Sequence, residues 1–345
     1  MRLHQRFARL IAASGPISIA HYMAEANARY YDSRDPLGSA GDFTTAPEIS
    51  QIYGELIGLW LADLWTRAGR PARVHYVELG PGRGTLARDA LGAGRQFGFV
   101  PTVNLVEPSR ALRAVQHARI ADATWHDDLS TLPDDAPLLI VGSEFLDALP
   151  VHHLVLTAAG WRERRVGLAG DKLVPVAGTR PMDAAVPATH ADAGLGAIIE
   201  TCPAAAAVVG EVARRLAQQG GAALLIDYGH VTPRYGSTLQ AVRAHRQVDP
   251  FAHPGDADLT AHVDFSVLPA VAAAAGARWM GTVDQGAFLR ALGLAARVEA
   301  LCRAAPASAN AIRAAAHRLA APEAMGELFK VIALGSPDWP TGAGF

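Results

Sequence analysis

The fold is decided by the stretch Val74-His75-Tyr76-Val77-Glu78-Leu79-Gly80-Pro81-Gly82-Arg83-Gly84-Thr85-Leu86. It predicts a short buried strand, a glycine-rich turn and the start of a helix. Glycines let the backbone turn tightly and let a ligand approach the main chain, and the following helix offers unpaired N–H groups. The stretch therefore favours a nucleotide-like cofactor, and the alternative is a merely tight connection between strand and helix.

The turn departs from the dinucleotide-binding pattern G-x-G-x-x-G, because Thr85 stands where the third glycine is needed. Glu78, two residues before Gly80, would repel a pyrophosphate and suits a ligand with a cationic group. A nucleotide-dependent oxidoreductase on the same scaffold is the alternative enzyme class, and Thr85 argues against it.

The rest of the chain alternates between strand-like and helical patterns. Short apolar runs predict buried parallel strands at 74–79, 102–107, 138–141 and 223–227. Helical stretches separate them at 84–92, 109–119 and 203–219. This alternation predicts an α/β fold with a doubly wound sheet, to which 328–334 returns as a last strand after a helical block at 285–321.

The segments around this core are less regular. Helices are expected at 3–30 and 48–68, joined by a loop at 32–47, and a hairpin is expected within 151–177. Residues 178–198 are rich in Ala, Pro, Gly and Asp and predict a loop or mobile insertion. The segment 231–262 has few apolar residues and is long for a passive connection, which indicates a function.

Composition excludes several classes of protein. Of 345 residues, 50% are hydrophobic and 19% are charged, and the net charge is −2, so we expect no nucleic-acid partner. Apolar runs are too short for a membrane span. The two cysteines, Cys202 and Cys302, suggest neither a disulfide framework nor a zinc site. The basic start weakly resembles a transit peptide, but its helical spacing favours a helix, and we expect a cytoplasmic, reducing location.

Acidic residues follow the predicted strands. Glu107 lies 23 positions after Gly84, about where an acid accepts hydrogen bonds from ribose hydroxyls in such folds. The alternative for Glu107 is an acid that is only solvated. Asp127 and Asp128 are placed to receive an adenine amino group, beside Trp125, and the alternative for this pair is a helix N-cap.

The segment Gly142-Ser143-Glu144-Phe145-Leu146-Asp147-Ala148-Leu149-Pro150 follows the fourth predicted strand. The carboxyl ends of strands face the ligand in a doubly wound sheet, so Glu144 and Asp147 are the predicted catalytic pair. Two carboxylates there can hold a cationic guanidinium and take up its proton. Helix capping by Ser143 and Asp147 is the alternative.

Polar residues late in the chain complete the predicted substrate side. His262 and Asp264 are expected to organise a loop at the mouth of the site, with Asp227 and Tyr228 as another wall, although Tyr228 is equally consistent with a core aromatic. We expect no metal, because nothing brings His262 and its acidic neighbours together with other ligands.

Four motifs occur in the order of a known family. They are Gly41-Asp42-Phe43-Thr44-Thr45-Ala46-Pro47-Glu48-Ile49-Ser50-Gln51, the turn Glu78–Gly84, then Glu144-Phe145-Leu146-Asp147-Ala148-Leu149-Pro150, and Leu259-Thr260-Ala261-His262-Val263-Asp264-Phe265. Together they resemble the MidA-like methyltransferases, which are related to a mitochondrial complex I assembly factor. The resemblance covers roughly residues 15–335.

The resemblance implies a Rossmann-like class I methyltransferase fold that uses S-adenosylmethionine. An N-terminal helical cap over 1–70 is expected to precede a catalytic domain over 71–345, with insertions at about 151–200, 231–265 and 285–325. The donor is expected at Glu78, Gly80, Gly82 and Gly84, with Glu107 near its ribose. The segment 41–51, including Thr44 and Thr45, is expected to fold over the donor.

The resemblance also implies a substrate, because the mitochondrial relative methylates an arginine on the quinone-pocket subunit of respiratory complex I. A protein arginine N-methyltransferase is therefore the leading prediction. A non-catalytic assembly chaperone that binds the donor, and a small-molecule methyltransferase, are the alternatives. Two positions depart from the family pattern: Ser143 replaces an Asn, and Gln240 replaces an Arg. Serine offers one hydroxyl where an amide offers a donor and an acceptor.

Overall fold

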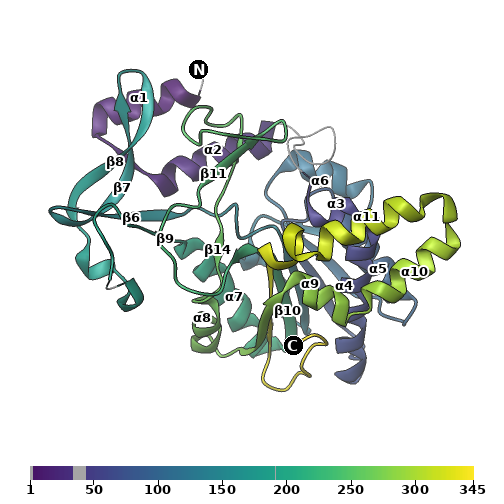
Figure 1. Cartoon of the computed structure of the whole chain (residues 1–345). Coiled ribbons are helices and arrows are strands. Elements are labelled where there is room, and N and C mark those ends of the chain that lie inside the picture. The colour runs from purple at the N-terminus through teal and green to yellow at the C-terminus, as the bar shows by residue number, and fades with distance from the viewer. Residues whose placement is uncertain (1–2, 34–43, 191) are drawn as a thin grey trace. The chain divides into compact units, whose positions relative to one another are not determined.

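The computed structural model describes residues 3–33, 44–190 and 192–345 (Figure 1). These residues form two compact units. The sheet unit comprises Thr44–Leu146, Val208–His230 and Val267–Phe345. The insertion unit comprises, of the described residues, 3–33, 147–190, 192–207 and 231–266. The domain boundary expected at residue 70 stays a prediction.

The sheet unit is built on strands in the order β15-β16-β10-β5-β2-β3-β4. Neighbouring pairs among β10, β5, β2, β3 and β4 are parallel, whereas β16 runs antiparallel to both of its neighbours. The bounds are β2 (His75–Leu79), β3 (Thr102–Val106), β4 (Thr124–His126), β5 (Leu138–Ser143), β10 (Gly221–His230), β15 (Arg278–Asp284) and β16 (Phe329–Gly335). The predicted α/β fold with a mostly parallel sheet is confirmed.

Two edge strands, β4 and β15, escape sequence prediction. Each is hydrogen-bonded to only one neighbour along the sheet path, and most of their residues are half-buried or exposed. An edge strand needs no continuous apolar run, so its sequence carries a weaker signal than that of a central strand.

Helices cover both faces of this sheet. In β10, Ala222, Leu224 and Ile226 pack in one core with α4 (Gln51–Arg67) and α5 (Thr85–Arg95), and the intervening side chains point to the other face. Figure 1 shows α7 (Pro203–Gln219) and α8 (Leu268–Ala274) on that other side of β10. A Cβ on Gly58 would lie 2.2 Å from the carbonyl oxygen of Ala90, so α4 and α5 approach closely because Gly58 has no side chain.

Further helices complete the sheet unit. α6 (Arg110–His117) follows β3, and a 3₁₀ turn at Leu129–Thr131 follows β4. The predicted helical block consists of α9 (Gln285–Ala291), α10 (Leu294–Ala304) and α11 (Ala309–Ala320), with a 3₁₀ turn at Pro306–Ser308. A π-helical turn at Pro322–Gly326 leads into β16.

The two predicted N-terminal helices are each interrupted. The helix expected at 48–68 is split into α3 (Ala46–Ile49) and α4, because Ser50 is extended and its hydroxyl accepts the Ile52 N–H at 3.3 Å. The helix expected at 3–30 is α1 (Leu3–Ser14), a two-residue strand β1 (Ile17–Ser18) and α2 (Ile19–Ser33). Gly15 has φ +82° and Pro16 follows it, which ends α1.

The insertion unit contains two small sheets. The predicted hairpin is confirmed as β6 (His152–Thr157) and β7 (Gly160–Ala169), and β7 also pairs with β8 (Lys172–Pro181). β9 (Ile198–Thr201) pairs with β6. The second sheet is β12 (Arg246–Val248), β11 (Gln240–Arg243) and β13 (Asp258–Thr260). A two-residue strand β14 (Val263–Asp264) follows it.

The prediction of a loop or mobile insertion at 178–198 is wrong at both ends. β8 continues to Pro181, β9 begins at Ile198, and 3₁₀ turns occupy Asp183–Ala185 and Ala188–His190. Composition misleads here because pairing of β8 with the long strand β7 satisfies the backbone groups of a Gly- and Pro-containing segment.

In the described ranges, no helix has the length and apolar character that crossing a membrane requires.

Candidate active site

The glycine-rich turn follows β2 at the carboxyl edge of the sheet. Gly80, Gly82 and Gly84 have φ of +61°, +53° and +76°, conformations that side-chain-bearing residues rarely adopt. A Cβ on Gly80 would lie 2.8 Å from Cδ2 of Phe145, and Gly84 is the N-cap of α5. The turn is a cradle of bare backbone that leads into a helix N-terminus, which suits a ligand that approaches the main chain.

Glu78 provides a buried carboxyl group directly before this cradle. It is 2% exposed, and the Tyr76 hydroxyl donates a 2.5 Å hydrogen bond to its Oε2. Burial raises the pKa of Glu78 to about 8, opposed by the hydrogen bonds from Tyr76 and from the backbone of Ala87. A cationic group beside this carboxyl would convert it to its charged form, so the donor set favours a positively charged ligand.

Glu107 directly follows β3 and is 5% exposed. Its carboxylate accepts the Ser109 N–H at 2.9 Å and the side-chain amide of Gln116 at 3.4 Å, and burial raises its pKa. The same Gln116 amide donates to the Gly82 carbonyl at 2.7 Å, and its oxygen accepts the Trp125 indole N–H at 2.8 Å. Gln116 thus joins the turn after β2 to the ends of β3 and β4, a role that sequence reasoning missed.

Asp127 and Asp128 follow β4 and make local contacts. Asp127 pairs with Arg113 at 2.5 Å and its side chain is 81% exposed. Asp128 caps the 3₁₀ turn at Leu129–Thr131, where it accepts the Ser130 N–H at 2.7 Å. The Trp125 ring stacks on His117 with ring centroids 5.5 Å apart.

The segment after β5 is held by hydrogen bonds from neighbouring elements. The Ser143 hydroxyl lies 2.9 Å from the Tyr53 hydroxyl of α4. Fully buried Asp227 accepts the N–H groups of Phe145 at 3.1 Å and Leu146 at 2.9 Å, and also that of Tyr228 at 3.0 Å. Asp227 therefore positions the backbone that carries Glu144.

Glu144 itself has an unusual conformation. Its φ is +53°, a strained value for a residue with a side chain, and its N–H donates to the Ile226 carbonyl at 2.9 Å. Its Oε1 accepts the Ala46 N–H at 2.6 Å, at the start of α3. Strain of this kind is concentrated at functional sites, so the observation supports the predicted importance of Glu144 without showing its role.

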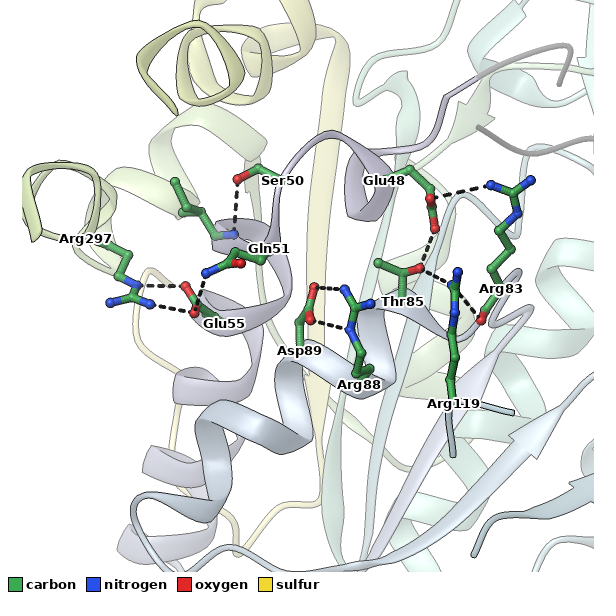
Figure 2. Close-up of polar contacts among 11 residues, drawn as sticks. Glu48, Ser50, Gln51, Glu55, Arg83, Thr85, Arg88, Asp89, Arg119 and Arg297 are labelled. Atoms are coloured by element: carbon green, nitrogen blue, oxygen red, sulfur yellow. Dashed lines mark hydrogen bonds and ion pairs between the residues drawn. The ribbon is translucent and has the colours of Figure 1, made fainter. Parts of the chain in front are cut away.

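A polar network links α3 to the glycine-rich turn, as Figure 2 shows. The Thr85 hydroxyl donates to Glu48 and accepts from Arg119 at 2.8 Å. Arg119 also donates to the Arg83 carbonyl at 3.1 Å, and the Arg83 guanidinium lies 3.8 Å from the Glu48 carboxylate. Sequence reasoning placed Glu48 in a family motif but gave it no role, because nothing local indicates a partner 37 residues away.

The predicted residues are divided between the two units. The structure gathers Glu78, the three glycines, Glu107, Ser143, Glu144, Asp227 and Tyr228 at the carboxyl ends of β2, β3, β5 and β10. Thr45 is the N-cap residue of α3 and directly follows Thr44, whereas 41–43 lie outside the described residues.

Asp147, His262 and Asp264 belong to the insertion unit. Asp147 is 6% exposed, and its carbonyl accepts the Ala261 N–H at 3.0 Å. The His262 N–H donates to the Thr238 hydroxyl at 2.8 Å, and Asp264 accepts the Ser266 N–H at 2.9 Å. No cluster of three His, Cys, Asp or Glu side chains suited to a metal ion occurs among the described residues.

Comparisons with known proteins identify the family. Residues 56–283 match a family of S-adenosyl-L-methionine-dependent methyltransferases. The protein arginine methyltransferase NDUFAF7, mitochondrial, of Mus musculus is 35% identical over 94% of this chain and 82% of its own length. Its homolog in Drosophila melanogaster has the same identity and coverage.

Solved structures agree with the sequence comparison. A Burkholderia thailandensis protein bound to S-adenosylhomocysteine is 30% identical, covers 99% of this chain and 94% of its own, and superposes with a TM-score of 0.88. A second crystal structure from that organism is 31% identical over the same shares, with a TM-score of 0.86.

The expected cytoplasmic location is contradicted by these comparisons. The curated relatives from mouse, frog and fly are all named as mitochondrial proteins. The prediction failed because it rested on the short, helix-forming start of the chain, whose composition separates the two locations poorly.

The cradle of bare backbone and the buried acids before and beside it fit a cationic nucleoside, and S-adenosylmethionine is the methyl donor of the matching proteins. The mouse relative and the Burkholderia structure match most of this chain, so the similarity is not confined to the sheet. The chain therefore belongs to the MidA-like family of S-adenosyl-L-methionine-dependent methyltransferases.

Proposed function

We propose that the chain transfers a methyl group to a guanidinium nitrogen of an arginine in a protein substrate. The proposal is carried by the relatives named protein arginine methyltransferases, at 35% identity over most of both chains. It is supported by Glu144, an acidic residue with a strained backbone that directly follows β5, the neighbour in the sheet of the strand before the glycine-rich turn. A carboxylate in this place can bind a guanidinium by paired hydrogen bonds.

The proposed donor site uses the cradle after β2. Gly80, Gly82 and Gly84 leave the main chain open to the amino-acid part of the donor, and Glu78 balances its positive charge. Glu107 accepts hydrogen bonds from the ribose hydroxyls. Asp127 and Asp128 are assigned to bind the adenine amino group. Thr44 and Thr45 are assigned to the segment that folds over the donor.

The proposed chemistry is an in-line displacement. When bound, S-adenosylmethionine supplies a methyl group activated by attachment to a sulfonium. The bond from nitrogen to methyl carbon forms as the bond from sulfur to that carbon breaks, and sulfur keeps the electron pair. Glu144 orients the guanidinium and takes up the proton that its nitrogen loses, and a share of Asp147 in this role stays a prediction. Alignment and exclusion of water supply most of the acceleration.

The remaining predicted residues of the sheet unit are assigned to the acceptor side. Ser143 and Tyr228 contact the substrate segment, and Asp227 forms the wall behind it. The predicted role of His262 and Asp264, in organising a loop of the insertion unit, stays a prediction. The candidate substrate is the quinone-pocket subunit of respiratory complex I, an assignment that rests on the family resemblance.

Glu144→Gln tests the proposal. Glutamine keeps an oxygen for the Ala46 N–H but cannot take up a proton, so S-adenosylhomocysteine should bind with nearly unchanged affinity while methyl transfer falls by roughly 100-fold or more. Transfer is followed by mass spectrometry of arginine-containing peptides from the candidate subunit. A variant that transfers at the normal rate would remove Glu144 from the mechanism.

A second comparison separates an enzyme from an assembly chaperone. Intact masses of the candidate subunit are measured from cells with and without the gene. A methylated arginine that disappears with the gene supports the enzyme, whereas identical masses together with a failed assembly would support a chaperone that only binds the donor.

A further inference from the structure

The short helix α3 contacts both predicted working parts of the sheet unit. Its residue Glu48 accepts the Thr85 hydroxyl at the start of α5, and its residue Ala46 donates to the Glu144 carboxylate at 2.6 Å. In the sequence, only Pro47 lies between Ala46, which binds Glu144, and Glu48. Three residues of backbone, 46–48, thus join the start of α5 to the segment after β5.

α3 depends on these contacts for its position. A helix of four residues is far below the length at which a helix is stable alone. Thr45 at its N-cap makes no side-chain cap, and Pro47 has no N–H, so the Ala46 N–H capped by Glu144 is a main anchor at this end. Toward the other end, where Ser50 joins α3 to α4, Glu48 adds a side-chain contact to α5.

The Thr85 hydroxyl extends the contact of Glu48 into the turn. It donates to Glu48 and accepts from Arg119, which also holds the Arg83 carbonyl at 3.1 Å. Figure 2 shows Thr85 joined to both Glu48 and Arg119, and Arg83 joined to the same two residues. The carbonyl of a peptide points away from its N–H, so a hydrogen bond to the Arg83 carbonyl also sets the direction of the next N–H, at Gly84.

We infer that Glu48 is a positioning residue that couples the glycine-rich turn to the Glu144 carboxylate through α3. Removal of its charge weakens the hydrogen bond from Thr85 and the ion pair with Arg83, and this loosens α3 and with it the cap between Ala46 and Glu144. The inference rests on the proposed function in taking Glu144 as the group that receives the proton. Its donor-side half is independent of the acceptor substrate.

Glu48→Gln tests the inference, with Glu55→Gln as the matched control. Glu55 lies on α4 and forms two hydrogen bonds with Arg297 of α10, at 2.7 and 2.6 Å, in the same unit and away from the turn in Figure 2. Glu48→Gln should weaken S-adenosylhomocysteine binding by calorimetry about ten-fold, and should lower kcat for methyl transfer at saturating donor about ten-fold. Glu55→Gln should leave both quantities unchanged, although it also removes a paired charge.

Thr85 provides a second test of the same contact. Thr85→Val removes the hydroxyl and should reproduce the loss of donor affinity, whereas Thr85→Ser keeps the hydroxyl and should restore it. In the double variant Glu48→Gln/Thr85→Val, the loss should be no larger than the larger single loss, because one change weakens and the other removes the same contact.

Three results would overturn the inference. Normal donor affinity and normal kcat in Glu48→Gln would show that α3 positions neither part. Weakened donor binding with an unchanged kcat would remove the coupling to Glu144, and additive losses in the double variant would remove the contact through Thr85. A wild-type chain that binds the donor but methylates no arginine would instead contradict the proposed function, and the binding tests would still decide the donor-side half.

Discussion

The side-chain amide of Gln116 donates to the main-chain carbonyl of Gly82 at 2.7 Å, which ties α6 to the glycine-rich turn. Gln116 is fully buried, and its side chain also forms hydrogen bonds with Glu107 and Trp125. Three strand ends therefore converge on one amide. Gln116 therefore helps to fix the position of the glycine-rich turn relative to Glu107, the residue predicted to bind the ribose.

Gln116→Met should lower affinity for S-adenosylhomocysteine by roughly ten-fold. Methionine fills a similar volume but offers no N–H donor to the Gly82 carbonyl or to Glu107. A buried polar group without its hydrogen bond costs about 1–3 kcal/mol of free energy. Calorimetry measures the affinity. The exposed Gln218 of α7, which accepts from Arg214 at 2.6 Å, is the control, and Gln218→Met should bind normally. Equal affinities for wild type and Gln116→Met would contradict this role.

Gly80→Ala should reduce both stability and donor binding. The left-handed φ of +61° costs alanine about 1–2 kcal/mol, and the new Cβ would lie 2.8 Å from the Phe145 ring. Gly92 in α5 is the matched control, since a Cβ there meets nothing within 4 Å. Gly92→Ala should raise stability by about 0.5–1 kcal/mol in urea unfolding. A Gly80→Ala protein as stable as wild type would show that the turn tolerates a side chain.

Donor binding near neutral pH should release a proton from Glu78. Its pKa of about 8 leaves the donor-free group mostly neutral at pH 7, and a bound cation favours the charged form. Calorimetry at pH 7 in buffers of different ionisation enthalpy should show this release, and at pH 10 the release should vanish. Glu78→Gln should abolish it. A binding enthalpy that is independent of buffer in wild type would contradict the assignment.

The same shift predicts a change in stability with pH. The folded pKa of Glu78 lies above the unfolded value, so its stabilising contribution is complete below about pH 4.5 and is lost as pH rises through about 8. The Tm of wild type should therefore fall relative to that of Glu78→Gln across this interval. Melting curves of the two proteins between pH 5 and pH 9 measure the difference, and parallel curves would contradict the prediction.

Asp227→Asn should destabilise the sheet unit and slow methyl transfer. Asp227 accepts three backbone N–H groups. Asparagine would present an N–H donor in place of one of the accepting oxygens. Loss of a hydrogen bond to a charged group lowers the free energy of unfolding by about 1.5–3 kcal/mol. Asp284→Asn is the control, because Asp284 is partly exposed and pairs with Lys330 at 2.6 Å. Loss of this ion pair should lower the free energy of unfolding by at most about 1 kcal/mol. Urea unfolding compares the two, and equal losses would remove the special role of Asp227.

Much of the sheet is predictable from local sequence. The strands β2, β5 and β10 are central and largely buried, and β3 is buried over its last three residues, so their apolar runs are easy to recognise. The turn after β2 needs glycines at three positive φ values. The helix breaks at Gly15 and Ser50 were missed because apolar residues continue at helical spacing across them. A cap at Ser50 is visible only in its backbone conformation.

The site is less predictable than the sheet. Strand ends placed Glu78, Glu107 and Glu144 together, because parallel strands direct their carboxyl ends to one edge. The assignment of Asp127 and Asp128 to the adenine stays a prediction from their place after β4, and in the structure they bind Arg113 and Ser130, respectively. Sequence position gives the neighbourhood of a side chain, and competing local partners then determine its hydrogen bonds.

The sequence by itself determined the α/β sheet, the bare turn after β2 and the acids at the strand ends, since each follows from a local pattern of apolar residues, glycines and strand termini. Only the tertiary structure decided the partners of Glu48, Gln116 and Asp227, which lie 37, 34 and 82 residues from groups that they hold. Such pairs form when packing of the core brings distant segments within hydrogen-bond distance, and no spacing along the chain encodes that approach.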